Sequence, residues 1–248
     1  MLEKALRQLA SRLGYEVRRR ETPSDLEASF LGMYEQCKPY TRTSIERMYA
    51  LYQATQYISN AKVPGAIVEC GVWRGGSTMI AVLTLVEAKD TTREVWLYDT
   101  YEGMSAPSEH DRDWRGIAAA DLMKRGEADK ETSVWCLAPL DEVQANMRST
   151  GYPAERVRFV KGKVEDTIPQ EAPEQIALLR LDTDFYDSTA HELRHLYPRL
   201  APGGILIIDD YGHWAGARKA TDEYFAQLGR PLLLQRIDYT GRIAVVTK

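Results

Sequence analysis

Five short apolar runs, separated by stretches of helical pattern, constrain the fold of this 248-residue chain more than any other feature of its sequence. The runs are AIVEC (66–70), EVWLYD (94–99), RVRFVKG (156–162), IALLRLD (176–182) and GGILIIDD (203–210). Runs this short and this rich in Val, Ile and Leu are typical of strands that are buried on both faces. Because strands that alternate with helices form parallel sheets, the sequence predicts a doubly wound α/β fold with helices on both faces of the sheet.

The C-terminal end of the sequence breaks this alternation. LLLQRID (232–238) and RIAVVTK (242–248) are separated only by Tyr239-Thr240-Gly241, which is a connection of hairpin length. We therefore expect the two final strands to pair antiparallel. A doubly wound sheet that ends in such a hairpin resembles the seven-stranded, Rossmann-like fold of the class I methyltransferases.

The N-terminal section, residues 1–62, carries a helical pattern and is predicted to be an extension of a catalytic domain that spans residues 63–248. Capping residues at 41–44 precede an apolar stripe that begins at Ile45. The first twenty residues combine six basic side chains with leucines at helical spacing. A basic amphipathic helix of this kind favours packing on its own protein or on a second subunit over binding to a membrane surface.

Composition and charge exclude several classes of protein. No apolar run approaches the ~20 residues that cross a bilayer, and charged residues throughout the first twenty positions do not resemble a secretory signal, so we expect a cytoplasmic protein with no membrane partner. The 32 basic and 36 acidic residues leave a net charge of −4, which does not favour nucleic acid as a partner. The three cysteines are too few and too widely spaced for a disulfide framework or a zinc site of the CxxC kind.

The segment that follows the first predicted strand, ECGVWRGGS (69–77), is a candidate cofactor loop. Glycines allow the backbone to approach a ligand at the C-terminal edge of a sheet, where doubly wound folds bind their cofactors. The loop has neither the Gly-Lys-Ser/Thr of a P-loop nor the spacing of a dinucleotide-binding GxGxxG. A tight strand-to-helix turn accounts for the glycines equally well. The candidate cofactor-binding residues of this loop are Glu69, Gly71, Gly75, Gly76 and Ser77.

Further cofactor contacts are expected at the ends of the next two strands. Asp99 ends the second strand, where Rossmann-like folds place a carboxylate that holds ribose hydroxyls, although a surface carboxylate is the plain alternative. We expect Glu69 to accept hydrogen bonds, directly or through water, from the ammonium group of an amino-acid moiety. After the third strand, Gly162 and the pair Glu165-Asp166 stand where an adenine would lie.

Four carboxylates follow the fourth and fifth strands. They are Asp182, Asp184, Asp209 and Asp210. Because parallel strands end at one edge of the sheet, these side chains are expected to gather there, and such crowding is costly unless a cation or shared protons relieve it. Oxygen ligands without Cys or a His pair favour a hard ion such as Mg²⁺. The alternative is that two of them only cap the following helices.

These aspartates suggest a chemistry as well as a metal. If the fourth strand stays extended, Asp182 and Asp184 project to the same side, so that one binds the metal and the other faces the substrate. Asp209 and Asp210 would point in opposite directions unless the backbone turns. A metal lowers the pKa of a bound hydroxyl, and a nearby carboxylate then takes the proton. Asp184 is our candidate for this base, and His213 is its competitor.

With these residues assembled, the sequence resembles the macrocin O-methyltransferase family, whose members methylate sugar hydroxyls on antibiotics. The resemblance covers most of the chain and rests on several motifs in family-like order. They are ERMYAL, ECGVWRGGS, YDTYEGM, LRLDTDFYDST and PRLAPGGILIIDDYGHWAGARKATDEY.

The resemblance implies S-adenosylmethionine and Mg²⁺ as cofactors and a glycosylated small molecule as acceptor. It implies Asp182, Asp209 and Asp210 as metal ligands, with Asp184 as the base, and it adds Gly103 of YDTYEGM to the cofactor-binding candidates. Residues 104–129, a long polar connection with few apolar anchors, would form a mobile lid. The N-terminal helices would help to build the substrate pocket and a homodimer or homotetramer.

Three alternatives remain beside this interpretation. A catechol or phenol O-methyltransferase would use the same cofactor and metal with a different acceptor. A dehydrogenase on a similar sheet is disfavoured, because the Tyr-x-x-x-Lys of residues 34–38 precedes the glycine loop instead of following the fourth strand. A non-catalytic scaffold would not need four mutually repelling aspartates. The candidate linings of the acceptor site are Tyr101, His110, Trp114 and Trp214.

Overall fold

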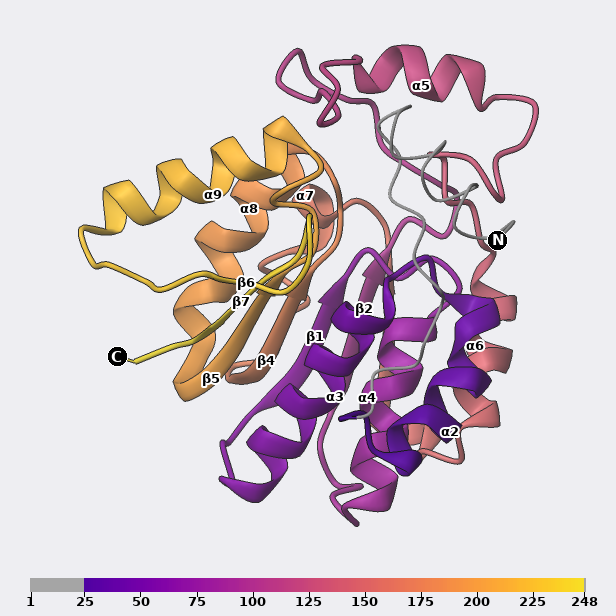
Figure 1. Cartoon of the computed structure of the whole chain (residues 1–248), viewed down its shortest axis with the longest axis vertical. Helices are drawn as coiled ribbons and strands as arrows, with labels where there is room; N and C mark the ends of the chain where they lie inside the picture. Colours follow the sequence, from indigo (N-terminus) through magenta and orange to yellow (C-terminus); the bar gives the residue numbers. More distant parts are fainter. Residues whose placement is uncertain (1–24, 248) are drawn as a thin grey trace, which may run out of the picture.

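A seven-stranded sheet runs through the middle of the molecule, and helices cover both of its faces (Figure 1). The computed structural model describes residues 25–247, so the amphipathic pattern of the first twenty residues lies outside the described part. The strand order is β3-β2-β1-β4-β5-β7-β6. The strands are β1 (Ala66–Cys70), β2 (Val95–Asp99), β3 (Val157–Lys161), β4 (Ile176–Leu181), β5 (Leu200–Ile208), β6 (Gln235–Arg236) and β7 (Arg242–Val245).

The sheet confirms the predicted alternation and the predicted C-terminal hairpin. Strands β1 to β5 pair in parallel, whereas β7 pairs antiparallel with both β5 and β6. All residues of β1 and β4 are buried, as expected for central strands. The run 232–238 was expected to form a longer strand, but only Gln235 and Arg236 pair with β7. Both are exposed at the edge of the sheet, where no further strand stabilises a longer ladder.

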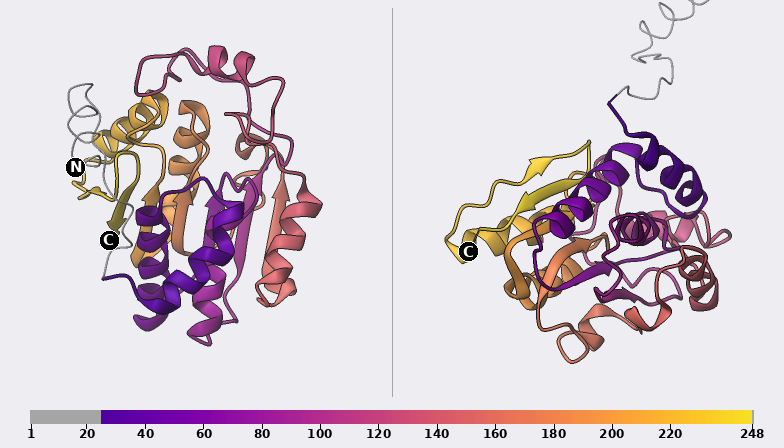
Figure 2. Two further views of the ribbon diagram at one scale, coloured as in Figure 1. Left: turned by 45° about the vertical axis from the view of Figure 1, so that its right-hand side comes forward. Right: turned by 90° about the horizontal axis from the view of Figure 1, so that it is seen from below.

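Alternate residues of the strands pack on opposite faces of the sheet, in two separate apolar cores. Ile67 and Leu97 join the core beneath α2, α3, α4 and α6, whereas Val68 and Leu179 join the core beneath α7, α8 and α9 (Figure 2). The helices are α2 (Ala28–Cys37), α3 (Ile45–Asn60), α4 (Gly76–Glu87), α5 (Ala119–Arg125), α6 (Leu140–Ser149), α7 (Val164–Thr167), α8 (Tyr186–Leu196) and α9 (Ala215–Leu228). Short 3₁₀ turns cover Lys38–Tyr40, Ala154–Arg156 and Tyr197–Arg199. Within residues 25–247, no helix combines the length and the apolar character that a membrane span requires.

The N-terminal helices that are described pack onto the sheet through α4. Met48, Leu51 and Ile58 of α3 are buried in the same core as α4. The helix begins at Ser44, whose side-chain oxygen accepts a hydrogen bond from the backbone N–H of Arg47 at 3.2 Å. The same hydroxyl donates to Asp238 at 2.7 Å. Ser44 therefore fixes both the start of α3 and its contact with the C-terminal hairpin.

Replacing Ser44 by Ala is expected to lower the free energy of unfolding by about 1–2 kcal/mol, because both of these hydrogen bonds are lost. Urea unfolding followed by circular dichroism measures the change. Ser59→Ala, on the same helix and without a side-chain hydrogen bond among the described residues, is the matched control. Equal stability of the two variants would show that the cap contributes nothing.

Residues 104–129, which we call the lid, cross over the C-terminal ends of the strands and carry α5 (Figures 1 and 2). The lid is more firmly anchored than its polar composition suggested. Ala119 and Met123 are buried against Phe185 and Trp214 in a small apolar cluster. The lid thus makes an apolar contact beside the first turns of α8 and α9.

Candidate active site

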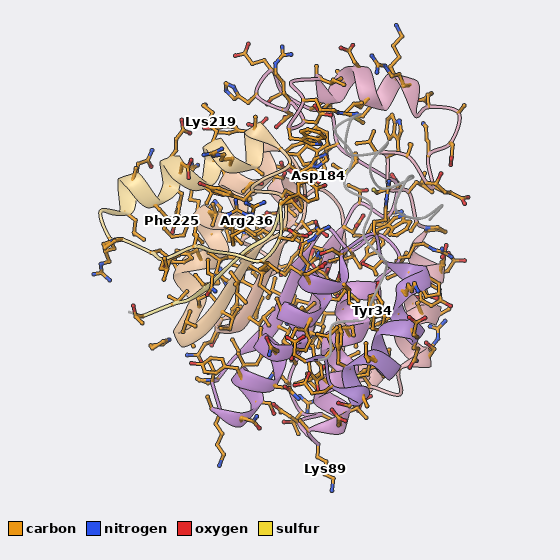
Figure 3. All side chains as sticks on the ribbon, in the orientation of Figure 1. Tyr34, Lys89, Asp184, Lys219, Phe225 and Arg236 are labelled. Atoms are coloured by element: carbon orange, nitrogen blue, oxygen red, sulfur yellow. The ribbon has the colours of Figure 1, made fainter. Side chains whose placement is uncertain are left out.

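A cavity of about 630 Å³ opens at the C-terminal edge of the sheet, beneath the lid. Residues that follow β1, β2, β4 and β5 line its floor, and residues from the N-terminal section and the lid line its sides. Figure 3 shows Asp184 at this edge, between the strands and the lid. Tyr40, Thr41, Arg42, Thr43 and Arg47 bring the N-terminal section into the wall.

Most of the sequence-predicted site residues line this one cavity. They are Gly71, Gly76, Ser77, Asp99, Gly103, Gly162, Asp182, Asp184, Asp209, Asp210 and His213. Glu69, Gly75 and Asp166 were also candidates, and they lie outside the lining. Gly75 is the N-cap residue of α4. Asp166 is exposed on α7, and its neighbour Glu165 lines the cavity instead.

Glu69 lies outside the lining of the cavity, and its carboxylate is bound by other protein groups. It is 3% exposed and accepts hydrogen bonds from Arg180 and from the hydroxyl of Thr78. Burial raises the pKa of Glu69 to about 7, although the charge of Arg180 opposes this effect. We therefore interpret Glu69 as the buried partner of Arg180 rather than as a direct contact of a cofactor.

The glycine loop lets three chain segments meet at the cavity. Gly71 has a φ of +82°, and a Cβ at this position would overlap the backbone oxygen of Asp182. A Cβ on Gly76 would lie 2.6 Å from the backbone carbonyl of Tyr40. The glycines therefore bring the aspartates after β4 and the N-terminal section within reach of the first turn of α4.

Replacing Gly71 by Ala is expected to cost about 2–4 kcal/mol of stability, because the positive φ is strained and the methyl group collides with the loop after β4. Cofactor affinity should fall with it, since the same loop lines the cavity. Thermal unfolding and calorimetric titration measure the two effects. Gly32→Ala is the matched control, because a Cβ there meets no atom within 4 Å. A Gly71→Ala protein that behaves like this control would contradict the close approach.

Asp99 joins the glycine loop to the end of β2. One carboxylate oxygen accepts from the backbone N–H groups of Val72 and Trp73 at 2.7 and 3.0 Å, and the other accepts from Tyr101 N–H at 2.7 Å. Burial raises the pKa of Asp99, and these backbone hydrogen bonds oppose the rise. A carboxylate offers about four acceptor positions, and the fourth receives only a long contact of 3.5 Å from the hydroxyl of Thr100, so Asp99 can still accept from a ligand hydroxyl that displaces it.

Three of the four predicted aspartates converge in the cavity. Asp182, Asp184 and Asp210 each offer one oxygen within 4.8 Å of the others, and we call them the carboxylate group. The backbone leaves the extended conformation after β4, since Asp184 has a φ of +67°. Its N–H donates to a carboxylate oxygen of Asp210 at 3.0 Å. This turn, rather than an extended strand, brings Asp184 beside its neighbours.

Asp209 lies apart from the carboxylate group, in contrast to its predicted place among the metal ligands. Its side chain forms ion pairs with Arg47 of α3 and with Arg180 of β4, the latter at 2.8 Å. Arg180 is 2% exposed and also contacts Asp182 at 2.7 Å. The backbone after β5 directs Asp209 toward these arginines and Asp210 toward Asp184.

Negative charge in the carboxylate group is only partly compensated by protein cations. Burial raises the pKa of Asp182 and of Asp210 well above the usual range, and neighbouring aspartates raise both further. Burial likewise raises the pKa of Asp184 to about 7. Arg180 is the one described cation that contacts the group. Such a cluster is relieved by shared protons or by a bound cation.

His213 and Trp214 line the wall of the cavity beside Asp184 and Asp210. The ring nitrogen Nδ1 of His213 lies 3.0 Å from the hydroxyl of Tyr239. Burial lowers the pKa of His213, so its neutral form predominates at pH 7. Of the four predicted aromatic linings, only Trp214 reaches the cavity. Tyr101 is buried behind the wall, His110 packs edge-to-face on Tyr186, and Trp114 is 66% exposed on the lid.

The chain matches a protein-family profile over nearly its whole length. The profile is that of the macrocin-O-methyltransferases, and the match covers residues 3–244. The chain belongs to the macrocin O-methyltransferase family. The resemblance seen in the sequence motifs is therefore confirmed, and the protein is an O-methyltransferase.

Relatives and a solved structure agree with this membership. An 8-demethyl-8-(2,3-dimethoxy-alpha-L-rhamnosyl)-tetracenomycin-C 4'-O-methyltransferase of Streptomyces olivaceus is 34% identical, over 88% of this chain and 79% of the relative. The mycinamicin III 3''-O-methyltransferase of Micromonospora griseorubida is 36% identical, over 82% of this chain and 76% of the relative. The solved O-methyltransferase NovP superposes with a TM-score of 0.71 at 32% identity, covering 84% of this chain and 83% of NovP. This likeness confirms the predicted class I methyltransferase fold.

Two arginines are the main features of this O-methyltransferase that sequence reasoning missed. Arg180 is the one charged residue of the buried strand β4, IALLRL, and such a residue requires buried partners. That signal was present in the sequence and predicts an ion pair inside the sheet. Arg47 lies within ERMYAL on an amphipathic helix and carries no comparable signal, because its partner Asp209 is 162 positions away.

Proposed function

We propose that this O-methyltransferase transfers the methyl group of S-adenosylmethionine to a sugar hydroxyl of a glycosylated small molecule, with the help of Mg²⁺. The observation that carries the proposal is the carboxylate group, which faces the same cavity as the glycine loop. The names of the two relatives, which methylate at numbered positions of glycosylated natural products, support the acceptor class. We expect the methylated product to be an antibiotic or a precursor of one.

The cofactor is assigned to the side of the cavity between the glycine loop and the loop after β3. Asp99 would accept a hydrogen bond from a ribose hydroxyl at the position that the Thr100 hydroxyl contacts at 3.5 Å. Gly71, Gly76 and Ser77 would lie along the amino-acid moiety, where the first turn of α4 offers free N–H groups. Gly162, with Glu165 beside it, would border the adenine. Gly103, at the base of the lid, would close this side.

The carboxylate group fits a hard divalent cation. The carboxylate oxygens of Asp182, Asp184 and Asp210 lie within 4.8 Å of one another, so modest side-chain movements would let two of them hold one Mg²⁺ ion. Mg²⁺ is commonly held by one or two carboxylates, with substrate oxygens and water completing the shell. We assign Asp182 and Asp210 as ligands. Asp209 instead balances Arg47 and Arg180.

Bound Mg²⁺ would lower the pKa of the acceptor hydroxyl and fix its direction toward the methyl group. Asp184 then takes the proton, because it lies beside both proposed ligands and is held there by its N–H bond to Asp210. The lid and Trp214 exclude water from this proton transfer. Most of the catalysis therefore consists of holding a hydroxyl in line with the donor carbon.

The acceptor side of the cavity favours a sugar over a flat phenol. Arg47, Asp113, Arg115 and His213 provide donors and acceptors for several hydroxyl groups, and Trp214 supplies one apolar face. A catechol needs a narrower apolar slot with fewer polar partners. The predicted homo-oligomer and the predicted cytoplasmic location stay predictions, and sedimentation velocity measures the former.

The proposal is tested first by titrating S-adenosylhomocysteine into the protein in a calorimeter, with and without Mg²⁺. Methyl transfer is then assayed on pairs of acceptors that share one aglycone, one with a deoxysugar and one without, and on catechols. We expect binding of the cofactor product and Mg²⁺-dependent methylation of the glycosylated member of each pair. Methylation of the bare aglycones or of catechols would contradict the acceptor class, and absence of cofactor binding would contradict the whole proposal.

A further inference from the structure

Asp111, in the lid, is buried without a cationic partner among residues 25–247 and has no role in the proposed chemistry. It is 1% exposed and lies outside the lining of the cavity. One of its carboxylate oxygens accepts the backbone N–H of Tyr186, the first residue of α8, at 2.8 Å. The other oxygen accepts the N–H and the hydroxyl of Ser108 at 2.7 and 2.8 Å. The carboxylate therefore joins the lid to the first turn of α8.

The neighbouring lid residues make the equivalent contacts with α9. The backbone oxygen of Arg112 accepts the N–H of Ala215, the first residue of α9, at 2.9 Å. Asp113 forms an isolated antiparallel bridge with Trp214. The backbone oxygen of Asp111 itself accepts the N–H of Ala119, where α5 begins. Three helix starts thus contact residues 111–113: those of α5 and α9 through backbone carbonyls, and that of α8 through the Asp111 carboxylate, which the N-terminal end of α8 favours.

Gly216 provides the space that this contact needs. A Cβ at Gly216 would overlap the carboxylate oxygen of Asp111 that bonds α8, and it would lie 2.9 Å from Tyr186 N. Gly in the interior of a helix is otherwise unfavourable by about 1 kcal/mol relative to Ala. Its presence in the first turn of α9 is explained by the docked carboxylate.

The two helix starts that Asp111 and Arg112 contact come directly after the functional aspartates. Asp182 and Asp184 lie in the loop that leads into α8, and Asp210 lies in the loop that leads into α9. The N–H of Asp184 bonds Asp210, and Phe185 packs edge-to-face on Trp214, so the two loops are also joined to each other. A movement of the lid that breaks the Asp111 contact would release the first turns of these helices.

We propose that Asp111 is a positioning residue that couples closure of the lid to the geometry of the carboxylate group, an inference that rests on the proposed function. With Asp111 docked, as in this structure, the lid lies over the cavity and the loops after β4 and β5 hold Asp184 and Asp210 together. With Asp111 undocked, the cavity opens for exchange of cofactor and acceptor. Docking is therefore the step that completes the site after both substrates have entered.

Four variants of the full chain test this coupling. Asp111→Ala removes the contact, and Asp111→Asn retains an oxygen for Tyr186 N–H but presents an amide to Ser108. Gly216→Ala displaces the Asp111 carboxylate through a substitution in α9, outside the lid. Asp121→Ala, an exposed lid residue with no side-chain partner among the described residues, is the matched control. Each protein is digested with trypsin, which cleaves the lid at its Arg and Lys residues, with and without S-adenosylhomocysteine and Mg²⁺, and kcat and KM are measured.

For Asp111→Ala and Gly216→Ala we expect lid cleavage at least about tenfold faster than in the control, and kcat lowered about tenfold or more with a raised acceptor KM. S-adenosylhomocysteine and Mg²⁺ should still bind but should no longer protect the lid. Asp111→Asn should fall between these variants and the wild type, because it keeps an acceptor for Tyr186 N–H; retained ligand binding without protection of the lid is the result that a merely structural role does not predict.

Two results would overturn the inference. In the first, all variants match Asp121→Ala in cleavage and kinetics. In the second, Asp111→Ala loses its melting transition together with ligand binding while Gly216→Ala behaves as the control, which would make Asp111 only a structural residue. Failure of the wild type to bind S-adenosylhomocysteine would count against the proposed function instead. The cleavage rates of the ligand-free proteins would still decide whether Asp111 holds the lid.

Discussion

Asp184→Asn is expected to lower kcat by about a thousandfold while Mg²⁺ still binds, because the amide cannot take the proton from the acceptor hydroxyl. The shape of the side chain is retained, and the backbone N–H bond from residue 184 to Asp210 does not depend on it. Single-turnover methylation at saturating cofactor measures the loss, and calorimetry measures the bound metal. Near-normal turnover with metal bound would remove Asp184 from this role.

The pH dependence of the wild type gives this prediction a second test. Asp184 must be ionised to act as the base, and burial raises its pKa to about 7, so kcat/KM should rise with pH through this group. A nearby cation stabilises the ionised form, and added Mg²⁺ should therefore move the acidic limb to lower pH. The limb should be absent from the residual activity of Asp184→Asn.

His213→Asn is the control for the competing base. His213 lines the cavity, and its lowered pKa leaves it neutral and able to accept a proton at pH 7. Its ring is already engaged with the hydroxyl of Tyr239, and we expect its loss to affect acceptor KM more than kcat. If His213→Asn abolished turnover and Asp184→Asn did not, the two assignments would have to be exchanged.

The fold was predictable because its determinants are local. The first four strands each lie within an apolar run that is visible in the sequence, β5 overlaps the fifth run and begins three residues before it, and the parallel order brings their C-terminal ends to one edge. The gathering of Asp182, Asp184 and Asp210 follows from that topology alone. The short length of β6 was not predictable in the same way. Its residues are exposed, and its length is set by the number of β7 residues that pair with it.

The roles of individual side chains were less predictable because they depend on pairing across the fold. Glu69 was assigned to the cofactor from its position after β1, but Arg180 of the adjacent strand attracts its carboxylate into the interior. Asp209 was expected beside Asp210, but consecutive residues diverge and two arginines hold Asp209. In each case a buried carboxylate pairs with an arginine that is distant in sequence. Because an unpaired charge is costly in the low-polarity interior, this pairing determines where the carboxylate lies.

The largest effect on metal binding is expected for Asp182→Asn and Asp210→Asn. Each should weaken Mg²⁺ binding about a hundredfold or more, because a neutral amide replaces one of the two charged ligands. Asp209→Asn is the matched control at the adjacent position. Its carboxylate is already shared between Arg47 and Arg180, so its replacement should weaken Mg²⁺ binding by less than about tenfold. It should instead lower thermal stability, because the buried Arg180 and the half-buried Arg47 each lose a partner. Calorimetric titration of Mg²⁺ in the presence of S-adenosylhomocysteine, together with melting temperatures, separates the two outcomes. A loss of metal binding in Asp209→Asn equal to that in Asp210→Asn would show that the arginines release Asp209 when the metal enters, and would return Asp209 to the ligand set that the sequence motifs first implied.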